Sequence, residues 1–312
     1  DSWALASAAG LALVPYFQLV MMWAYVDLVA AAYFTLAAWM VCRRPFPPLA
    51  CGVLCGLAAG TKATGVFAPV LAGACMAARR ARPKGWTAFL LAFLAVASPW
   101  GARNFAFTGN PFAPFLAGRI PTLWWSPENL ARYSRELKSY EWGHKPVGGL
   151  SDLVAYPWRA SVENLGVLDP QAGMGGWFVW LLPLLLILRP AGARAPALLS
   201  LGYFALWMLV PRQVRYTLPV WPAAALACVL ALRSLARLGG PALIPVWGSG
   251  VLLAVHLAAG FQRQYMVMNT LPVVFGMETP EEYLARGMPG RPYSVRARGW
   301  LVKERGSEKV LV

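Results

Sequence analysis

The chain has 312 residues, of which 58% are hydrophobic and only 13% are charged. A soluble domain of this size carries about a quarter charged residues, because it needs a solvated surface, so the composition argues against a soluble protein. The net charge of +15 would suit a nucleic-acid binder, but the basic residues gather in short clusters between apolar runs, which argues against that role.

Apolar segments recur along the chain in the way that repeated bilayer crossings require. In chain order they are residues 3–23, 28–42, 47–60, 64–78, 86–101, 174–188, 196–210, 217–232 and 243–260. We therefore predict an all-α polytopic membrane protein with about nine transmembrane helices. Several segments are shorter than the ~20 residues of a perpendicular crossing. Residues 47–78 accordingly have two open interpretations, a hairpin of two short helices or one crossing plus a re-entrant piece.

Clusters of basic residues at the ends of apolar runs are typical of cytoplasmic loops. Four such clusters are Arg43-Arg44, Arg79-Arg80 with Arg82 and Lys84, Arg189 with Arg194, and Arg233 with Arg237. With all four inside, the outer side holds Asp27, Thr61-Lys62, residues 102–173, residues 211–216 and everything after about residue 261. Trp and Tyr residues, including Trp100 and Trp221, then fall near the outer boundary, as expected of an aromatic belt.

The five cysteines all lie in or at the edge of predicted spans, at positions 42, 51, 55, 75 and 228. Cys51 and Cys55 are one helical turn apart, but no further Cys or His cluster accompanies them. We therefore expect no metal site there, and we interpret the cysteines as small apolar core residues.

We expect a transmembrane helical domain in residues 1–263, with an outer loop at 102–173, and a C-terminal extracytoplasmic region that starts in 264–312. In the loop, Ser126-Pro127-Glu128 followed by Leu130, Tyr133 and Leu137 predicts a capped amphipathic helix on the membrane surface. Thr279-Pro280-Glu281-Glu282 predicts the start of another short helix. The chain enters an apolar run at once and stops in what resembles an opening strand, so we expect a piece of a longer polypeptide.

Four basic residues fall on the predicted outer side close to the membrane, namely Lys62, Arg103, Arg212 and Arg215. Membrane insertion does not require cations there, and an interfacial cation is costly unless it reaches water or an anion. One hypothesis is that these residues together bind a phosphate at the outer leaflet. The alternative is that each one extends to water or to a lipid headgroup by itself.

Asp27 is the only acidic residue between Asp1 and Glu128. It is either an N-cap with a favourable helix dipole, or a carboxylate that acts as a base, orients an acceptor or helps to bind a metal. His144 and His256 are isolated, and we interpret both as structural. The sequence contains no Ser/His/Asp set, Gly-rich phosphate loop or metal-ligand spacing.

Three segments together resemble the polytopic GT-C glycosyltransferases. They are Tyr25-Val26-Asp27-Leu28, Gly56-Leu57-Ala58-Ala59-Gly60-Thr61-Lys62-Ala63-Thr64-Gly65, and Ser98-Pro99-Trp100-Gly101-Ala102-Arg103-Asn104 continuing through Thr108-Gly109-Asn110-Pro111-Phe112. Their order and spacing are similar to bacterial relatives of the dolichyl-phosphate-mannose protein mannosyltransferases and of the lipid A aminoarabinose transferase. Two weaker signals agree, Val214-Arg215-Tyr216-Thr217-Leu218-Pro219 and the segment from Gly276 to Leu284.

The resemblance implies transfer of a sugar from a polyprenyl-phosphate carrier to a lipid, glycan or protein acceptor. The active site would face the outer side of the membrane, which we expect to be a bacterial inner membrane. By resemblance, Lys62, Arg103, Asn104 and Arg215 would contact the donor phosphate, and Asp27 would match a second-position catalytic carboxylate. A divalent metal stays open as a cofactor. The family's principal catalytic acid lies in the first outer loop, upstream of this sequence, so we expect this chain to lack the main base.

Two other classes stay open beside the enzyme. A transporter or lipid flippase predicts broken helices, ionisable residues at the bilayer midplane and repeat symmetry, whereas the ionisable residues here lie at span boundaries and no repeat is visible. A non-catalytic membrane subunit for envelope-polysaccharide assembly would also fit the long outer loop. We prefer the glycosyltransferase, because only that hypothesis uses all three motif segments.

Overall fold

The structure is a computed structural model. It describes residues 2–12, 17, 26–123, 125–139, 151, 155, 185, 187–188, 190, 192–209, 214–263, 269, 271–279 and 282–283. Every regular element in these ranges is a helix, which confirms the all-α prediction for the described part. The chain divides into two compact units, Asp1–Ala254 and Val255–Val312. The predicted boundary near residue 263 separates membrane from outer region, and that division stays a prediction.

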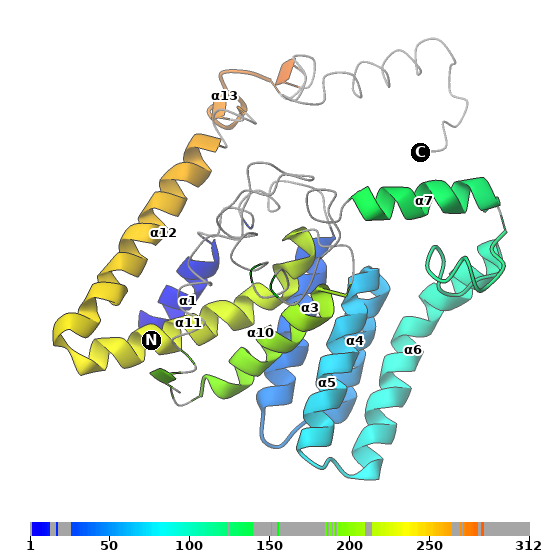
Figure 1. The fold of residues 1–312 in the computed structure, drawn as a ribbon, viewed down its shortest axis with the longest axis horizontal. Coiled ribbons are helices and arrows are strands. Elements are labelled where there is room, and N and C mark those ends of the chain that lie inside the picture. The colour runs from blue at the N-terminus through cyan, green and yellow to red at the C-terminus, as the bar shows by residue number, and fades with distance from the viewer. Residues whose placement is uncertain are drawn as a thin grey trace. The chain divides into compact units, whose positions relative to one another are not determined.

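Most predicted apolar segments coincide with helices (Figure 1). In order these are α1 Ser2–Ala12, α3 Asp27–Cys42, α4 Pro48–Thr61, η1 Ala63–Val66, α5 Phe67–Ala78, α6 Pro83–Thr108, α7 Pro127–Ser139, α10 Arg194–Trp207, η3 Val214–Val220, α11 Trp221–Leu238, η4 Gly240–Ala242, α12 Leu243–Arg263 and α13 Leu271–Val274. Most of the predicted span at 174–188 lies outside the described residues, as does the second half of the span at 3–23.

Residues 47–78 form a hairpin of two short helices, and how this hairpin crosses the bilayer stays a prediction. Helices α4 and α5 pack against each other (Figure 1), and Lys62 and the short helix η1 connect them. Pro48 stands at the first position of α4, where its missing N–H costs no hydrogen bond. At the far end, Lys62 has an extended backbone that stops the helix.

Helix α6 is longer than predicted. Pro99 lies inside it and cannot donate to the carbonyl of Ala95, but the Ser98 hydroxyl donates to that carbonyl at 3.3 Å. The helix therefore continues to Thr108, where Gly109 ends it in the left-handed conformation at φ 74°. The first residues of the predicted outer segment, 102–108, thus form about two further turns of α6.

Glycines allow α4 and α6 to pack closely. A Cβ added at Gly52 would meet the Phe89 carbonyl, and one added at Gly56 would lie 2.7 Å from Val96 Cβ. Small residues four apart permit such close approach between membrane helices. Because residue numbers increase together along this contact, the helices run parallel, and Lys62 lies at the same end of the pair as residues 99–103 of α6.

The best-buried part of the first unit is built on α10 and α11. Tyr203, Trp207 and Trp221 are fully buried there, together with small residues of α11 such as Ala224 and Cys228. Trp221 is thus a core residue, and its predicted place in an aromatic belt was wrong. Cys51, Cys55 and Cys228 are buried free thiols, as predicted, whereas Cys42 is exposed and does not belong to the core.

Two described helical segments are long and apolar enough to cross a bilayer, Pro83–Thr108 and Arg215–Leu238. Five shorter apolar helices occur beside them. This supports membrane association, whereas the count of about nine crossings stays a prediction. At one end of the helices the Arg79 guanidinium donates to the Arg43 carbonyl at 3.3 Å, so two of the Arg-rich clusters meet.

Two predicted helix starts are confirmed. The Ser126 hydroxyl accepts a hydrogen bond from the Asn129 N–H at 3.2 Å and caps α7. In the second unit, the Glu282 N–H donates to the Thr279 hydroxyl at 3.2 Å, and the Glu282 carboxylate accepts from the Thr279 N–H at 2.8 Å. This is a capping box, and its hydrogen bonds lower the pKa of the Glu282 carboxyl.

Candidate functional site

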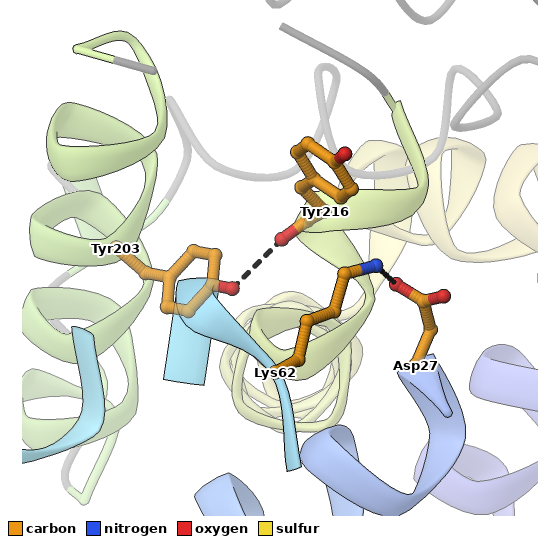
Figure 2. Close-up of polar contacts among 4 residues, drawn as sticks. All are labelled: Asp27, Lys62, Tyr203 and Tyr216. Carbon is orange, nitrogen blue, oxygen red and sulfur yellow. Dashed lines mark hydrogen bonds and ion pairs between the residues drawn. The ribbon is translucent and has the colours of Figure 1, made fainter. Parts of the chain in front are cut away.

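Asp27 is the first residue of α3, and its side chain is only 3% exposed. Val26 occupies the N-cap position, and no side-chain cap hydrogen bond forms there. The N-cap interpretation of Asp27 was therefore wrong. Its carboxylate instead forms an ion pair with the ammonium of Lys62 (Figure 2). The positive end of the helix dipole also favours a carboxylate in this first turn.

Lys62 is held in the break between α4 and η1. Its N–H donates to the Ala58 carbonyl at 3.3 Å, and its own carbonyl accepts from the Gly65 N–H at 2.8 Å. Gly65 packs so closely on the Ala58 carbonyl that a Cβ would collide with it. The spacing of the Gly-Thr-Lys-Ala-Thr-Gly motif thus shapes a tight turn, and the turn aims the lysine side chain at Asp27.

Arg215 and Tyr216 come from η3, far along the chain, and complete the cluster. The Lys62 ammonium lies 4.3 Å from the centroid of the Tyr216 ring, and the Arg215 guanidinium lies 5.3 Å from the same centroid. Both distances are within the range of cation–π attraction. Two cations and one buried carboxylate therefore gather around a single aromatic ring. We call Asp27, Lys62, Arg215 and Tyr216 the cation cluster.

Tyr203 of α10 lies beside the cation cluster and is hydrogen-bonded to the Tyr216 backbone (Figure 2). Its hydroxyl donates to the Tyr216 carbonyl at 2.7 Å. Its ring packs edge-to-face on Phe34 of α3 at 5.0 Å and on Phe67 of α5 at 5.2 Å. The buried Tyr203 side chain therefore contacts α3, which carries Asp27, and α5, which follows Lys62. Its hydroxyl connects these helices to η3, which carries Arg215.

The ionisation of Lys62 reflects these surroundings. Burial lowers the pKa of the Lys62 ammonium below its ordinary range, Asp27 opposes that shift, and Arg215 adds to it. The side chain of Lys62 is 18% exposed, so the ammonium is withdrawn from most solvent but not sealed from it. A cation in this position gains more from an anionic ligand than one in bulk water does.

Arg103 lies at the same end of the molecule but outside the cation cluster. It is exposed on α6, with its guanidinium 5.7 Å from the Trp100 ring centroid and 5.5 Å from that of Phe107. Within the described ranges, the contacts of Arg103 are with its own helix, and the structure does not join it to Lys62 directly. The prediction that it contacts a donor phosphate stays untested.

Asn104 lies in the last turns of α6, and its side chain bonds to the loop that follows this helix. Its amide donates to the Pro111 and Ala113 carbonyls at 3.4 and 3.1 Å. Asn110 is fully buried, donates to the Phe115 carbonyl at 2.9 Å and accepts from the Phe112 N–H at 2.9 Å. The Arg-Asn…Gly-Asn-Pro motif therefore shapes the loop, and this accounts for Asn104 without a ligand.

Sequence reasoning missed the two tyrosines. Tyr216 lies within a motif of the sequence, but nothing there marked its ring as the support of two cations. Tyr203 carried no signal, since it is one aromatic residue among many in an apolar helix. Arg212 and His144 lie outside the described residues, and the side chain of His256 is not described. In the described part of the chain, no group of three or more His, Cys, Asp or Glu residues could hold a metal.

No family model, no curated protein and no solved structure matches this chain. The resemblance to the GT-C glycosyltransferases therefore rests on the sequence motifs alone.

Proposed function

We propose that this protein is a multi-pass membrane glycosyltransferase that takes a sugar from a polyprenyl-phosphate carrier. The acceptor is a lipid, glycan or protein at the outer face of a bacterial inner membrane. The single observation that carries the proposal is the cation cluster. Two of the three motif segments supply Asp27 and Lys62, the weaker Val214–Pro219 signal supplies Arg215, and these residues meet around the Tyr216 ring.

The surface of the helices supports a membrane setting for this site. Helix α6 exposes Leu90, Leu91 and Leu94, and α12 exposes Trp247 and Val251. Exposed apolar rows of this extent are unfavourable in water and favourable against lipid tails. Arg43 and Arg79 meet at the C-terminal ends of α3 and α5, and Asp27 and Lys62 pair at the opposite ends of these helices. This arrangement suits a cytoplasmic end with the arginines and an outer end with the ion pair.

The chemistry of the cation cluster suits transfer from a phosphate leaving group. The bond between the anomeric carbon and the phosphate oxygen breaks, and the bonding electron pair leaves with the phosphate. Lys62 and Arg215 would stabilise this developing charge. A new bond forms from the acceptor oxygen to the anomeric carbon, and the acceptor proton moves to a carboxylate. Asp27 is the carboxylate nearest to these cations in the described part of the chain.

The test is transfer from a panel of polyprenyl-phosphate sugars by the full-length protein in proteoliposomes. We expect Lys62→Ala and Arg215→Ala to lower the rate at least 100-fold, since each removes a charge that stabilises the leaving group. Arg82→Ala, an exposed arginine of an Arg-rich cluster, is the matched control and should retain the rate. Arg103→Ala tests whether Arg103 also contacts the donor phosphate.

Full activity in both Lys62→Ala and Arg103→Ala would overturn the site assignment. Transfer from no donor of the panel, with the protein correctly inserted, would overturn the proposed activity. Movement of the labelled carrier across the bilayer without sugar transfer would instead identify a flippase.

A further inference from the structure

We propose that phosphate binding at the cation cluster is an exchange, in which the ligand's phosphate takes Lys62 away from Asp27 and leaves the Asp27 carboxylate free. This inference rests on the proposed function, because it specifies how the donor phosphate enters that site. It assigns Asp27 two successive roles, first as the partner of Lys62 and then as the free carboxylate beside the bound donor.

The positions around Lys62 favour exchange over simple addition. The ammonium is enclosed by the Asp27 carboxylate and by the Tyr216 ring. A phosphate that reached Lys62 while Asp27 stayed in place would lie beside a buried carboxylate and be repelled by it. Arg215 shares the ring with Lys62, so a phosphate that displaces Asp27 gains a second cation at the same step.

The place of Asp27 in α3 makes its release feasible. A buried carboxylate that loses its cationic partner is normally costly. Asp27, however, stands in the first turn of a helix of 16 residues, where N–H groups lack intrahelical partners and the dipole is positive. This helix end can take over part of the stabilisation that Lys62 provided.

The exchange has a consequence for catalysis. In the structure the Asp27 carboxylate is engaged by the Lys62 ammonium. When the phosphate occupies Lys62, the freed carboxylate can accept the acceptor's proton. The Asp27 carboxylate would therefore become available only when the donor is in place.

A double-mutant cycle on the full chain in nanodiscs tests the exchange. The probe is farnesyl methyl phosphate, a phosphodiester with an isoprenoid tail, and farnesol is the uncharged comparison. Affinities are measured for the native chain, Asp27→Asn, Lys62→Met and the double variant. We expect Asp27→Asn to bind the probe about tenfold more tightly, because the competitor is gone, and Lys62→Met to bind it more weakly.

The decisive comparison is the effect of Asp27→Asn when Lys62 is absent. Exchange predicts that the gain in affinity disappears in the Lys62→Met background. A gain that persists there would mean general repulsion and would overturn the inference, as would unchanged or weaker binding by Asp27→Asn alone. Glu128→Gln on α7 removes an exposed carboxylate and should leave the affinity unchanged.

A second measurement needs no substitution, in case Asp27→Asn fails to fold. Solid-state NMR on protein with ¹⁵N-lysine and ¹³C-aspartate reports the Lys62–Asp27 proximity through their dipolar coupling. Exchange predicts that this coupling is lost on addition of the probe and that a ¹⁵N–³¹P coupling replaces it. A Lys62–Asp27 coupling that survives in the presence of bound probe would overturn the inference while leaving the proposed function intact. No binding of the probe by any variant would overturn both.

Discussion

The ammonium of Lys62 lies 4.3 Å from the centre of the Tyr216 ring, although the two residues come from distant parts of the chain. The contact brings the turn after α4 together with η3, and it holds Arg215 beside Lys62. An aromatic face attracts cations without neutralising them. The ring thus holds the two cations side by side, while Lys62 also pairs with the Asp27 carboxylate.

Binding of a phosphodiester should weaken at alkaline pH through Lys62. Burial lowers the pKa of Lys62 from its ordinary value of 10.5, so the ammonium is charged below that lowered pKa and becomes neutral above it. Affinity for farnesyl methyl phosphate should thus fall as the pH rises, at a lower pH than the ordinary lysine pKa of 10.5 would give. In Lys62→Arg the loss should move to higher pH, because arginine stays protonated. Titration of both proteins by isothermal calorimetry checks this, and identical pH profiles would contradict it.

Tyr203→Phe should loosen the cation cluster without emptying the core. The substitution keeps the ring contacts with Phe34 and Phe67 but removes the hydrogen bond to the Tyr216 carbonyl. We expect a loss of about 1 kcal/mol in stability and a several-fold loss of affinity for the phosphodiester probe. Tyr33→Phe, a half-buried tyrosine of α3, is the matched control and should change neither quantity. Equal probe affinity in all three proteins would refute a positioning role for Tyr203.

The glycines of α4 should differ sharply in their tolerance of alanine. Gly56→Ala places a Cβ 2.7 Å from Val96 Cβ and should destabilise the helix pair by about 1–3 kcal/mol. A Cβ at Gly60 meets nothing within 4 Å, so Gly60→Ala should be neutral or slightly stabilising. Thermal unfolding in detergent measures both variants. Similar effects at the two positions would argue against the close parallel packing of α4 and α6.

Asn110→Ala should disrupt the loop after α6. Its side chain is fully buried and bonds to the Phe115 carbonyl, the Thr122 hydroxyl and the Phe112 N–H. Loss of these bonds in a buried site should cost about 2–4 kcal/mol. Limited proteolysis of the folded Asn110→Ala variant should then show cleavage within residues 109–123. Asn129→Ala, an exposed position on α7, is the control and should leave cleavage unchanged.

Local sequence patterns determined much of the secondary structure. Apolar length predicted most of the described helices but not α13, and capping residues marked the starts of α7 and of the turn after Thr279. These features depend on neighbours within a few residues, which a sequence displays directly. Helix α6 continues to Thr108, beyond the predicted span, because that span was set by the apolar run, which ends near residue 101.

Identification of the candidate site required both the sequence and the tertiary structure. Sequence patterns by themselves singled out Lys62, Arg103, Arg212 and Arg215 as cations that membrane insertion does not require, and Asp27 as an isolated carboxylate, because the ends of apolar runs are visible in the sequence. Only the tertiary structure decided that Asp27 pairs with Lys62, that Tyr216 supports both cations and that Asn104 serves a loop. Such contacts depend on the distances between helices remote in sequence, and packing sets these distances.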